Sequence, residues 1–360
     1  MNNMLRVLTL LTFLFTTVSY AAKPTRDELH RFRLLRDRNI LDRDLKKGLD
    51  GDKYTRFFDL DISASSGLKS LVADVSDISD SGTNATNTLE LVALLTENVN
   101  AEWYADLGLI FGAPLPGIKV KKHRFLPSLF YDLNAALSIS IDNKESTTNP
   151  NLRLFLKKDT KIGLFTKYKR NGNTRDQLSV ALYQLSRSDL KVSQTGSDLA
   201  TKTKIFDLDD LSKSQKSIST DIRYRRKFKH SSFMIELQEL QLWRLKVESP
   251  SLYGSSPLLH LRTAKTFEGE TFDIVPFFGF HRRKRYSVAK GLYLGTQLVN
   301  KSHIPLEGSV KFDNQFLTFT PQIKTSWVHF IYQFKTPYRN PQNNVWVPTI
   351  HSFNLSVPFP

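Results

Sequence analysis

Apolar and polar residues alternate with a period of two through most of the chain after residue 100. Between residues 101 and 111, for example, Trp103, Leu107 and Phe111 fall on one side, and Glu102 and Asp106 fall on the other. This period is typical of a β-strand with two unlike faces. With a short strand at Phe58 to Ile62, we predict about fourteen strands. The others are expected at 101–111, 129–142, 152–158, 161–169, 177–186, 218–229, 232–245, 258–267, 271–282, 288–299, 308–322, 325–335 and the C-terminal stretch.

The C-terminal stretch has the clearest alternation. Its apolar positions are Phe353, Leu355, Val357 and Phe359, and Ser352, Asn354 and Ser356 lie between them. A final strand with an aromatic residue near its end resembles the closing strand of bacterial outer-membrane β-barrels, where it also serves as an insertion signal. The stretch departs from that pattern in two ways, because Pro360 follows the aromatic residue and Asn354 occupies a position that is usually glycine. A bulge near Pro348 would restore the register upstream.

The resemblance implies an all-β fold, an antiparallel transmembrane β-barrel of roughly twelve to sixteen strands with a small helical insertion near the N-terminus. Most of the predicted strands approach the ~9 to 11 residues that a tilted strand needs to cross a bilayer. A barrel of this kind must close, since every backbone group in the membrane has to be paired. The expected partners are outer-membrane lipids, lipopolysaccharide and the barrel-insertion machinery. Neither a cofactor nor a metal is expected, and nucleic acid is not an expected partner.

The N-terminal residues have the three-part form of a secretory signal peptide. A short segment with Arg6 precedes an apolar run at 7–18, and Ser19 and Ala21 are small residues at the positions that signal peptidase reads. We therefore expect a signal peptide at 1–21, a charged helical segment at 22–52 and the barrel at 53–360. Export and the absence of cysteine both favour a bacterial envelope protein, and the resemblance implies the outer membrane.

Two regions before residue 100 have helical periodicity instead. Thr25 and Glu28 have capping-box spacing ahead of a charged run, which predicts an exposed helix that ends near Gly48. Within 67–99, apolar residues recur at helical spacing in two halves, which predicts two modest helices inserted into the barrel. These two helices could plug the lumen or cap one end of the barrel.

The chain has a formal net charge of +16, which points to anionic partners. Three basic runs lie at or beyond the ends of predicted strands, where a charge avoids the cost of facing lipid. They could contact lipopolysaccharide phosphates or form a pore mouth that favours anions; ordinary solvated loops are the alternative. The candidate contact residues are Lys119, Lys121, Lys122, Arg124, Arg223, Arg225, Arg226, Lys227, Arg282, Arg283, Lys284 and Arg285.

Signals for catalysis are sparse, and the sequence has neither a Gly-x-Ser-x-Gly motif nor a His-Glu-x-x-His motif. A pore or structural component of the envelope is the expected function. A barrel enzyme acting on lipids is the first alternative, and it would need a serine and a histidine on the outer wall near one rim. His260 and His329 are the strand histidines considered for that role. A soluble β-sandwich that binds a polyanion is the second alternative.

Overall fold

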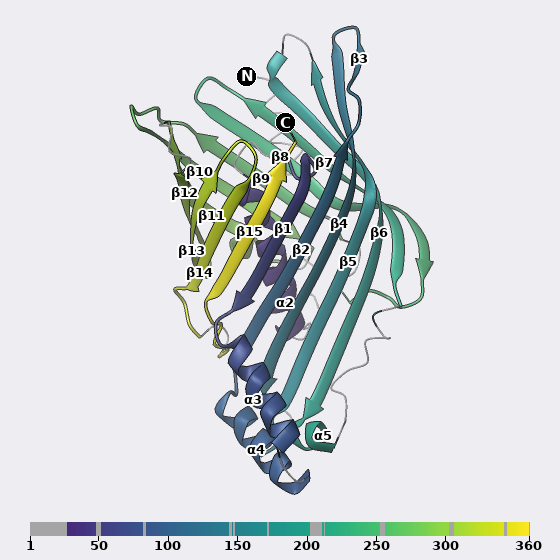
Figure 1. The fold of residues 1–360 in the computed structure, drawn as a ribbon, viewed down its shortest axis with the longest axis vertical. Helices are drawn as coiled ribbons and strands as arrows, with labels where there is room; N and C mark the ends of the chain where they lie inside the picture. Colours follow the sequence, from purple (N-terminus) through teal and green to yellow (C-terminus); the bar gives the residue numbers. More distant parts are fainter. Residues whose placement is uncertain are drawn as a thin grey trace.

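The computed structural model describes residues 27–47, 52–81, 84–143, 146, 148–170, 173–201, 211, 213–252, 256–284, 286–301, 306–341 and 344–359. Within these residues fourteen antiparallel strands form one closed barrel, and helix α2 lies inside the ring of strands (Figure 1). The expected signal peptide lies outside the described residues. No helix in the described part of the chain is both long enough and apolar enough to cross a membrane.

The barrel closes at two pairings between strands that are not sequential neighbours. The first strand, β1, pairs with the last, β15, and β2 pairs with β4, with the short strand β3 (Ile118–Val120) extending one edge of β4. Every other pair joins consecutive strands. The strands are β1 (Arg56–Ser65), β2 (Glu102–Pro114), β4 (His123–Asp142), β5 (Asn151–Arg170), β6 (Asn173–Thr195), β7 (Gln215–Lys227), β8 (Ser231–Val247), β9 (Leu258–Lys265), β10 (Phe272–Arg283), β11 (Leu292–Asn300), β12 (Leu306–Asp313), β13 (Phe316–Lys324), β14 (His329–Pro337) and β15 (Ile350–Pro358).

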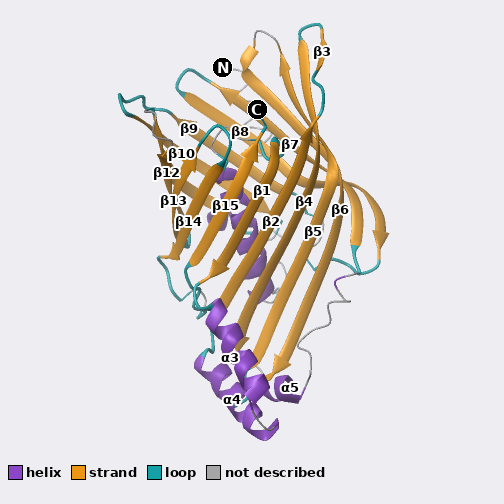
Figure 2. Ribbon diagram, in the orientation of Figure 1, coloured by secondary structure: helices purple, strands orange, loops and turns teal. Residues whose placement is uncertain are grey.

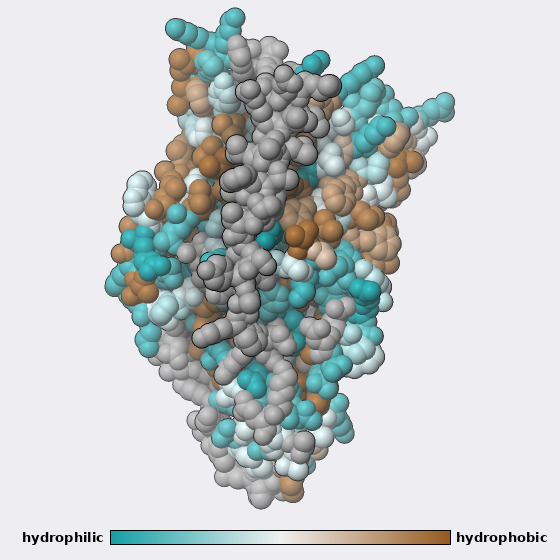
Figure 3. Space-filling view, turned by 180° about the vertical axis from the view of Figure 1, so that it is seen from behind, coloured by the Kyte–Doolittle hydropathy of each residue, from teal (hydrophilic) through white to brown (hydrophobic). Residues whose placement is uncertain are grey.

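The two faces of the wall follow the alternation of the sequence. Asp59 and Asp61 of β1 are buried in the lumen, whereas Ile62 is 48% exposed on the outside. On β15, Phe353 is 64% exposed outward and Asn354 is buried. The face predicted to be apolar in the closing strand therefore is the outer face of the barrel. Figure 3 shows apolar side chains gathered in the upper half of the molecule and a mostly hydrophilic lower end.

The wall is uneven in height. Strands β4, β5 and β6 have 20, 20 and 23 residues, whereas β9 and the strands from β11 to β15 have eight or nine. The long strands pass beyond the short ones at the lower end of Figure 2, where three further helices lie. These helices are α3 (Leu68–Ser81), α4 (Asn84–Glu97) and the short α5 (Gly196–Thr201).

Helices α3 and α4 neither plug nor cap the barrel but cover its outer wall. Leu71 of α3 and Leu91 of α4 pack in one cluster with Trp103, Leu152 and Leu154, which point outward from the strands. The outward face of β5 therefore stays apolar at its lower end, where α3 and α4 cover it. The two helices occupy the predicted positions, but neither the plug nor the cap expected for them is observed.

Several predicted boundaries differ from the structure. The two strands expected at 152–158 and 161–169 form the single strand β5, and the strand expected at 308–322 is the hairpin β12–β13, which turns at Asn314 and Gln315. The strand predicted at 177–186 is longer at both ends and continues to Thr195 as part of β6. The stretch from 288 begins with a single helical turn, α6 (Val288–Gly291), before β11. Polar residues facing the lumen reduce the sequence contrast on which such boundaries depend.

Candidate functional site

Helix α2 (Asp27–Lys46) fills the lumen and is the centre of the candidate site. The prediction that this helix is exposed was wrong, because Arg36, Arg38 and Asp42 are each no more than 2% exposed. A helix with charges on every side is normally stable only in solvent or among many ionic partners. Here the partners are the inward-facing carboxylate and amino groups of the barrel wall.

The N-terminal half of α2 binds the strands of the long wall. Arg31 Nε lies 2.7 Å from Glu102 Oε2 of β2, and the guanidinium of Arg36 pairs with Asp159 of β5. Between these contacts Phe32 is completely buried and packs against Tyr104 and Phe155. A small apolar cluster thus fixes this part of the helix between two ion pairs.

The next turn of α2 binds the opposite wall through Asp37. Its carboxylate accepts two hydrogen bonds from Arg283 of β10, at 2.9 and 3.0 Å, and a third from the Tyr286 hydroxyl at 2.6 Å. Arg283 Nη2 also lies 3.1 Å from Glu239 Oε2 of β8, which in turn accepts a hydrogen bond from Arg187. Arg283 contacts Asp37 through two hydrogen bonds, and all of these groups are buried. They therefore fix the position of α2 along the barrel and its rotation about its own axis.

Asp42 of α2 binds two lysines of the barrel wall. Its carboxylate oxygens lie 2.5 Å from Lys311 Nζ of β12 and 2.9 Å from Lys335 Nζ of β14. Lys335 Nζ also donates a hydrogen bond to the side-chain oxygen of Asn39 at 3.0 Å. All four side chains are buried. Lys311 Nζ has a second carboxylate partner, Asp313 Oδ2 at 3.4 Å, whereas Asp42 is the one carboxylate described in an ion pair with Lys335.

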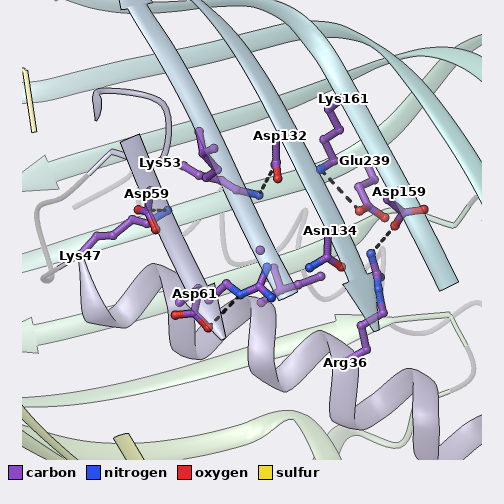
Figure 4. Close-up of a pocket in the computed structure, with 14 residues that line it drawn as sticks. Arg36, Lys47, Lys53, Asp59, Asp61, Asp132, Asn134, Asp159, Lys161 and Glu239 are labelled. Carbon is purple, nitrogen blue, oxygen red and sulfur yellow. Dashed lines mark hydrogen bonds and ion pairs between the residues drawn. The ribbon is translucent and has the colours of Figure 1, made fainter. Parts of the chain in front are cut away.

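The C-terminal half of α2 binds β1 and β2. Arg43 pairs with Asp106 and lies 3.3 Å from Asp61, and Lys46 Nζ lies 2.7 Å from the second oxygen of Asp61. Lys47 Nζ continues the series at 3.3 Å from Asp59 (Figure 4). The wall has Gly108 opposite the Arg43 guanidinium, where an added Cβ would lie only 2.3 Å from Arg43 Nη1.

The segment that connects α2 to β1 is also anchored in the lumen. Asp52 lies 2.5 Å from Lys167 Nζ and accepts a hydrogen bond from Gln177 at 2.8 Å. Burial alone would raise the pKa of the Asp52 carboxyl, but the charges of Lys167 and Arg223 together hold that pKa below its usual value. Lys53 Nζ lies 3.2 Å from Asp132 Oδ2 of β4.

Very little space remains between α2 and the wall. Figure 4 shows Arg36, Lys47, Lys53 and Lys161 meeting acidic groups around the main cavity, which has a volume of about 20 Å³. That volume holds about one water molecule. A barrel of fourteen strands is wide enough for an α-helix of about 10 to 12 Å diameter, and here the helix takes up that width.

The predicted contact residues divide into lumen and surface groups. The expectation that all of them lie at strand ends outside the barrel was wrong for Arg223 and Arg225, which face the lumen, and for Arg283, which binds α2. In the runs on β7 and β10 alternate residues point inward, because the strand continues into the run, whereas Lys119, Lys121, Lys122 and Arg124 at the β3–β4 hairpin are all exposed. Surface residues near the β3–β4 hairpin and the end of β7 lie at one end of the barrel, and those after β10 lie at the other; Arg285 is outside the described residues. The surface group comprises Lys119, Lys121, Lys122, Arg124, Arg226, Lys227, Arg282 and Lys284.

The two strand histidines considered for catalysis have no serine partner in the described hydrogen bonds. His260 is buried in the lumen, where a nitrogen of its ring lies 2.5 Å from the Tyr293 hydroxyl. His329 lies at the start of β14 and also faces inward. Neither lies on the outer wall, where a lipid-directed site would have to be.

No family model matches the sequence, and no curated protein matches it. Among solved structures, similar chains include CdiB from Acinetobacter baumannii (8% identity, TM-score 0.36, 86% of this chain and 60% of that one) and CdiB from Escherichia coli (8%, 0.35, 85% and 63%). A third is the transport unit of the autotransporter AIDA-I from E. coli (7%, 0.33, 89% and 97%). The chain thus spans less than two thirds of either CdiB structure. With TM-scores below 0.5, these structures are not used to assign a fold. The closed antiparallel barrel is established by the chain's own strand pairing.

Proposed function

We propose that this chain is an integral outer-membrane barrel that α2 keeps closed at rest, and that it becomes a pore when α2 leaves the lumen. One observation carries the proposal: a helix rich in charged side chains is enclosed in a barrel wall that is polar inside and apolar outside. A purely structural barrel could fill its lumen with side chains from the wall. Using a separate segment held by ion pairs leaves the lumen able to open.

The outer surface supports the membrane part of the proposal. Side chains such as Ile162, Leu294, Phe319 and Phe353 are between 50 and 64% exposed around the ring. An apolar belt of this kind would be costly in water, at roughly 25 cal/mol for each Å² left uncovered. The short strands have eight to twelve residues, which suits the ~9 to 11 needed to span a bilayer.

The polar contacts of α2 support the gating part. Most of its anchoring contacts are ionic, and removal of the helix would leave their partners on the wall to be hydrated by a water-filled channel. An apolar plug would instead leave an apolar lumen that water enters poorly. The wall residues exposed on opening include both Lys311 and Lys335 and both Asp59 and Asp61.

Membrane placement is tested by cell fractionation and by gel migration in mild detergent. We expect the protein in the outer-membrane fraction, with a band that shifts on boiling because the closed barrel resists detergent until it is heated. The closing strand is the proposed contact with the insertion machinery, through Phe353, Leu355, Val357 and Phe359. Replacement of Phe359 by Ser is expected to lower the amount of heat-modifiable protein. A soluble wild-type protein whose band does not shift would contradict the membrane assignment.

An anion preference is proposed only for the opened barrel. It would arise from the exposed cluster Lys119, Lys121, Lys122 and Arg124 at the β3–β4 hairpin, which has a single sign of charge. With a KCl gradient across a planar bilayer, we expect the opened barrel to give a reversal potential of the sign found when chloride is more permeant than potassium. Replacing all four residues by Gln should move that potential toward zero; an unchanged value would assign selectivity to the lumen. The same variant tests contact with lipopolysaccharide, whose phosphates should bind it more weakly.

A further inference from the structure

A serine, a histidine and a tyrosine form a hydrogen-bonded series on the outer wall, where β1, β14 and β15 meet. Ser66 Oγ lies 3.2 Å from Nε2 of His351, and Nδ1 of the same ring lies 2.6 Å from the Tyr332 hydroxyl. The imidazole is held between the rings of Tyr332 and Phe334, with the Phe334 ring edge-on at 5.5 Å between centroids. In the tautomer with hydrogen on Nδ1, His351 donates to Tyr332 and can accept the Ser66 proton at Nε2.

Ser66 lies in a turn from a strand to a helix. Strand β1 ends at Ser65, Gly67 has a φ of +77°, and α3 begins at Leu68. The first backbone N–H groups of a helix have no partner within it, so those that follow Ser66 are positioned to stabilise negative charge beside its hydroxyl. Nucleophilic serines in α/β-hydrolases occupy the same kind of turn, with the backbone N–H of the next residue in the oxyanion hole.

An apolar groove of about 430 Å³ begins beside this series. Its walls include Tyr332 and Phe353, next to His351, and then Ile62, Leu60, Leu355 and Phe330 farther along the strands. The strand register orders these residues, since Ala64 pairs with His351, Ile62 with Phe353 and Leu60 with Leu355. The groove therefore leads from the Ser66–His351 pair into the belt, and it also extends sideways across β14 and β13 to Leu306 of β12.

The pair itself lies at the rim of the belt. Beyond His351 the outer face becomes polar, with Thr349 and Thr336 joined by a hydrogen bond of 3.3 Å between their hydroxyl groups. Covered wall and helix α3 begin immediately after Ser66. The ester groups of a phospholipid lie at the same boundary between headgroup and acyl chain. The Ser66 hydroxyl thus lies at the depth of the ester groups, and the groove lies at the depth of the acyl chains.

We propose that Ser66 and His351 form a catalytic pair that hydrolyses long-chain acyl esters of membrane lipids, with Tyr332 as the positioning residue. Ser66 Oγ attacks the acyl carbonyl carbon and passes its proton to His351 Nε2. The ester C–O bond breaks, and the leaving alkoxide takes that proton. Water then attacks the acyl-serine, again giving a proton to His351, and the fatty acid and the free serine are released with that proton returned to Ser66.

The assay uses the full-length wild-type protein in detergent micelles with p-nitrophenyl palmitate and p-nitrophenyl acetate, and in phosphatidylethanolamine vesicles with released fatty acid as the readout. We expect faster turnover of the palmitoyl ester and covalent labelling of Ser66 by a fluorophosphonate. Ser66→Ala and His351→Asn should each lower kcat/KM at least ~100-fold. The matched control is Ser326→Ala, which removes another exposed serine hydroxyl at the β13–β14 turn, away from the Ser66 turn, and should keep full activity.

Tyr332→Phe separates positioning from packing, because it keeps the ring and removes only the acceptor for the Nδ1 proton. We expect a lower kcat with an unchanged KM for the palmitoyl ester, whereas damage to the groove would raise KM. Heat-modifiable migration verifies that each variant has folded. Hydrolysis retained in Ser66→Ala, or absent from the folded wild-type protein, would overturn the proposal. Either result leaves the gating proposal intact, since Ser66 lies outside the lumen.

Discussion

Deletion of residues 27–46 is expected to convert a barrel with almost no ionic current into one that opens in large, stable conductance steps. The deletion removes the whole of α2, and the cavity between α2 and the wall at Arg36, Ile40 and Arg43 has a volume of only about 20 Å³. The vacated width is that of an α-helix with side chains, about 10 to 12 Å. Ions would then cross a lumen lined by acidic and basic side chains. Planar-bilayer recordings of the purified full-length and deleted proteins measure the difference directly.

Two controls accompany this deletion. Heat-modifiable migration of the deleted protein verifies that the barrel still closes, as expected because all fourteen strands are retained. A synthetic peptide of residues 27–47, added to the deleted protein, should reduce the current by rebinding the wall. A current as small as that of the full-length protein would mean that the helix is not what closes the lumen.

Among single substitutions, the largest effect on closure of the barrel is expected for Asp42→Asn, which replaces one carboxylate oxygen by an amide group. This substitution leaves Lys311 and Lys335 without their shared carboxylate inside the closed lumen. Breaking one side of a buried ion pair costs about 3 to 5 kcal/mol, and each 1.4 kcal/mol is a factor of ten in an equilibrium. The docked state of α2 should therefore lose at least ~100-fold in population relative to the undocked state, and brief openings should appear in single-channel recordings.

Asp74→Asn is the matched control for that substitution. Asp74 is exposed on α3, outside the barrel, so the same chemical change should leave the closed baseline unaltered. Lys335→Met in the Asp42→Asn background should restore part of the closure, because it removes the ammonium group whose described ion pair is with Asp42. Equal opening in the two aspartate variants would contradict a specific role for the Asp42 contacts.

The wall of the barrel could be predicted from the sequence because its signal is local. Each strand has its own alternation of apolar and polar residues, and the faces of Phe353 and Asn354 follow from their positions in that alternation. The strand ends were harder to predict. Polar side chains facing the lumen look the same as polar side chains in a turn, as in the predicted break within β5 at Asp159 and Thr160.

The position of α2 could not be predicted from its own residues. Its charges resemble those of a solvated helix, and its partners Asp159, Arg283 and Lys335 lie more than 100 residues away along the chain. One signal was present in the strands. Lysines and arginines at inward positions, such as Arg223, Arg225 and Lys335, indicate that the lumen contains acidic groups to pair with. The Ser66–His351 pair was likewise hidden, because only the β1–β15 closure brings residues 285 positions apart together.

Cysteine labelling of the lumen tests the central claim, that α2 closes the barrel, most directly. The chain has no cysteine, so Ile40→Cys places a single thiol on the buried face of α2 that lines the main cavity. Asp74→Cys on α3 provides an exposed reference thiol. In outer membranes treated with a maleimide-linked polyethylene glycol, the account predicts rapid modification at residue 74 and none at residue 40 until denaturant is added. Equal rates at the two positions would show that α2 is not held in the lumen.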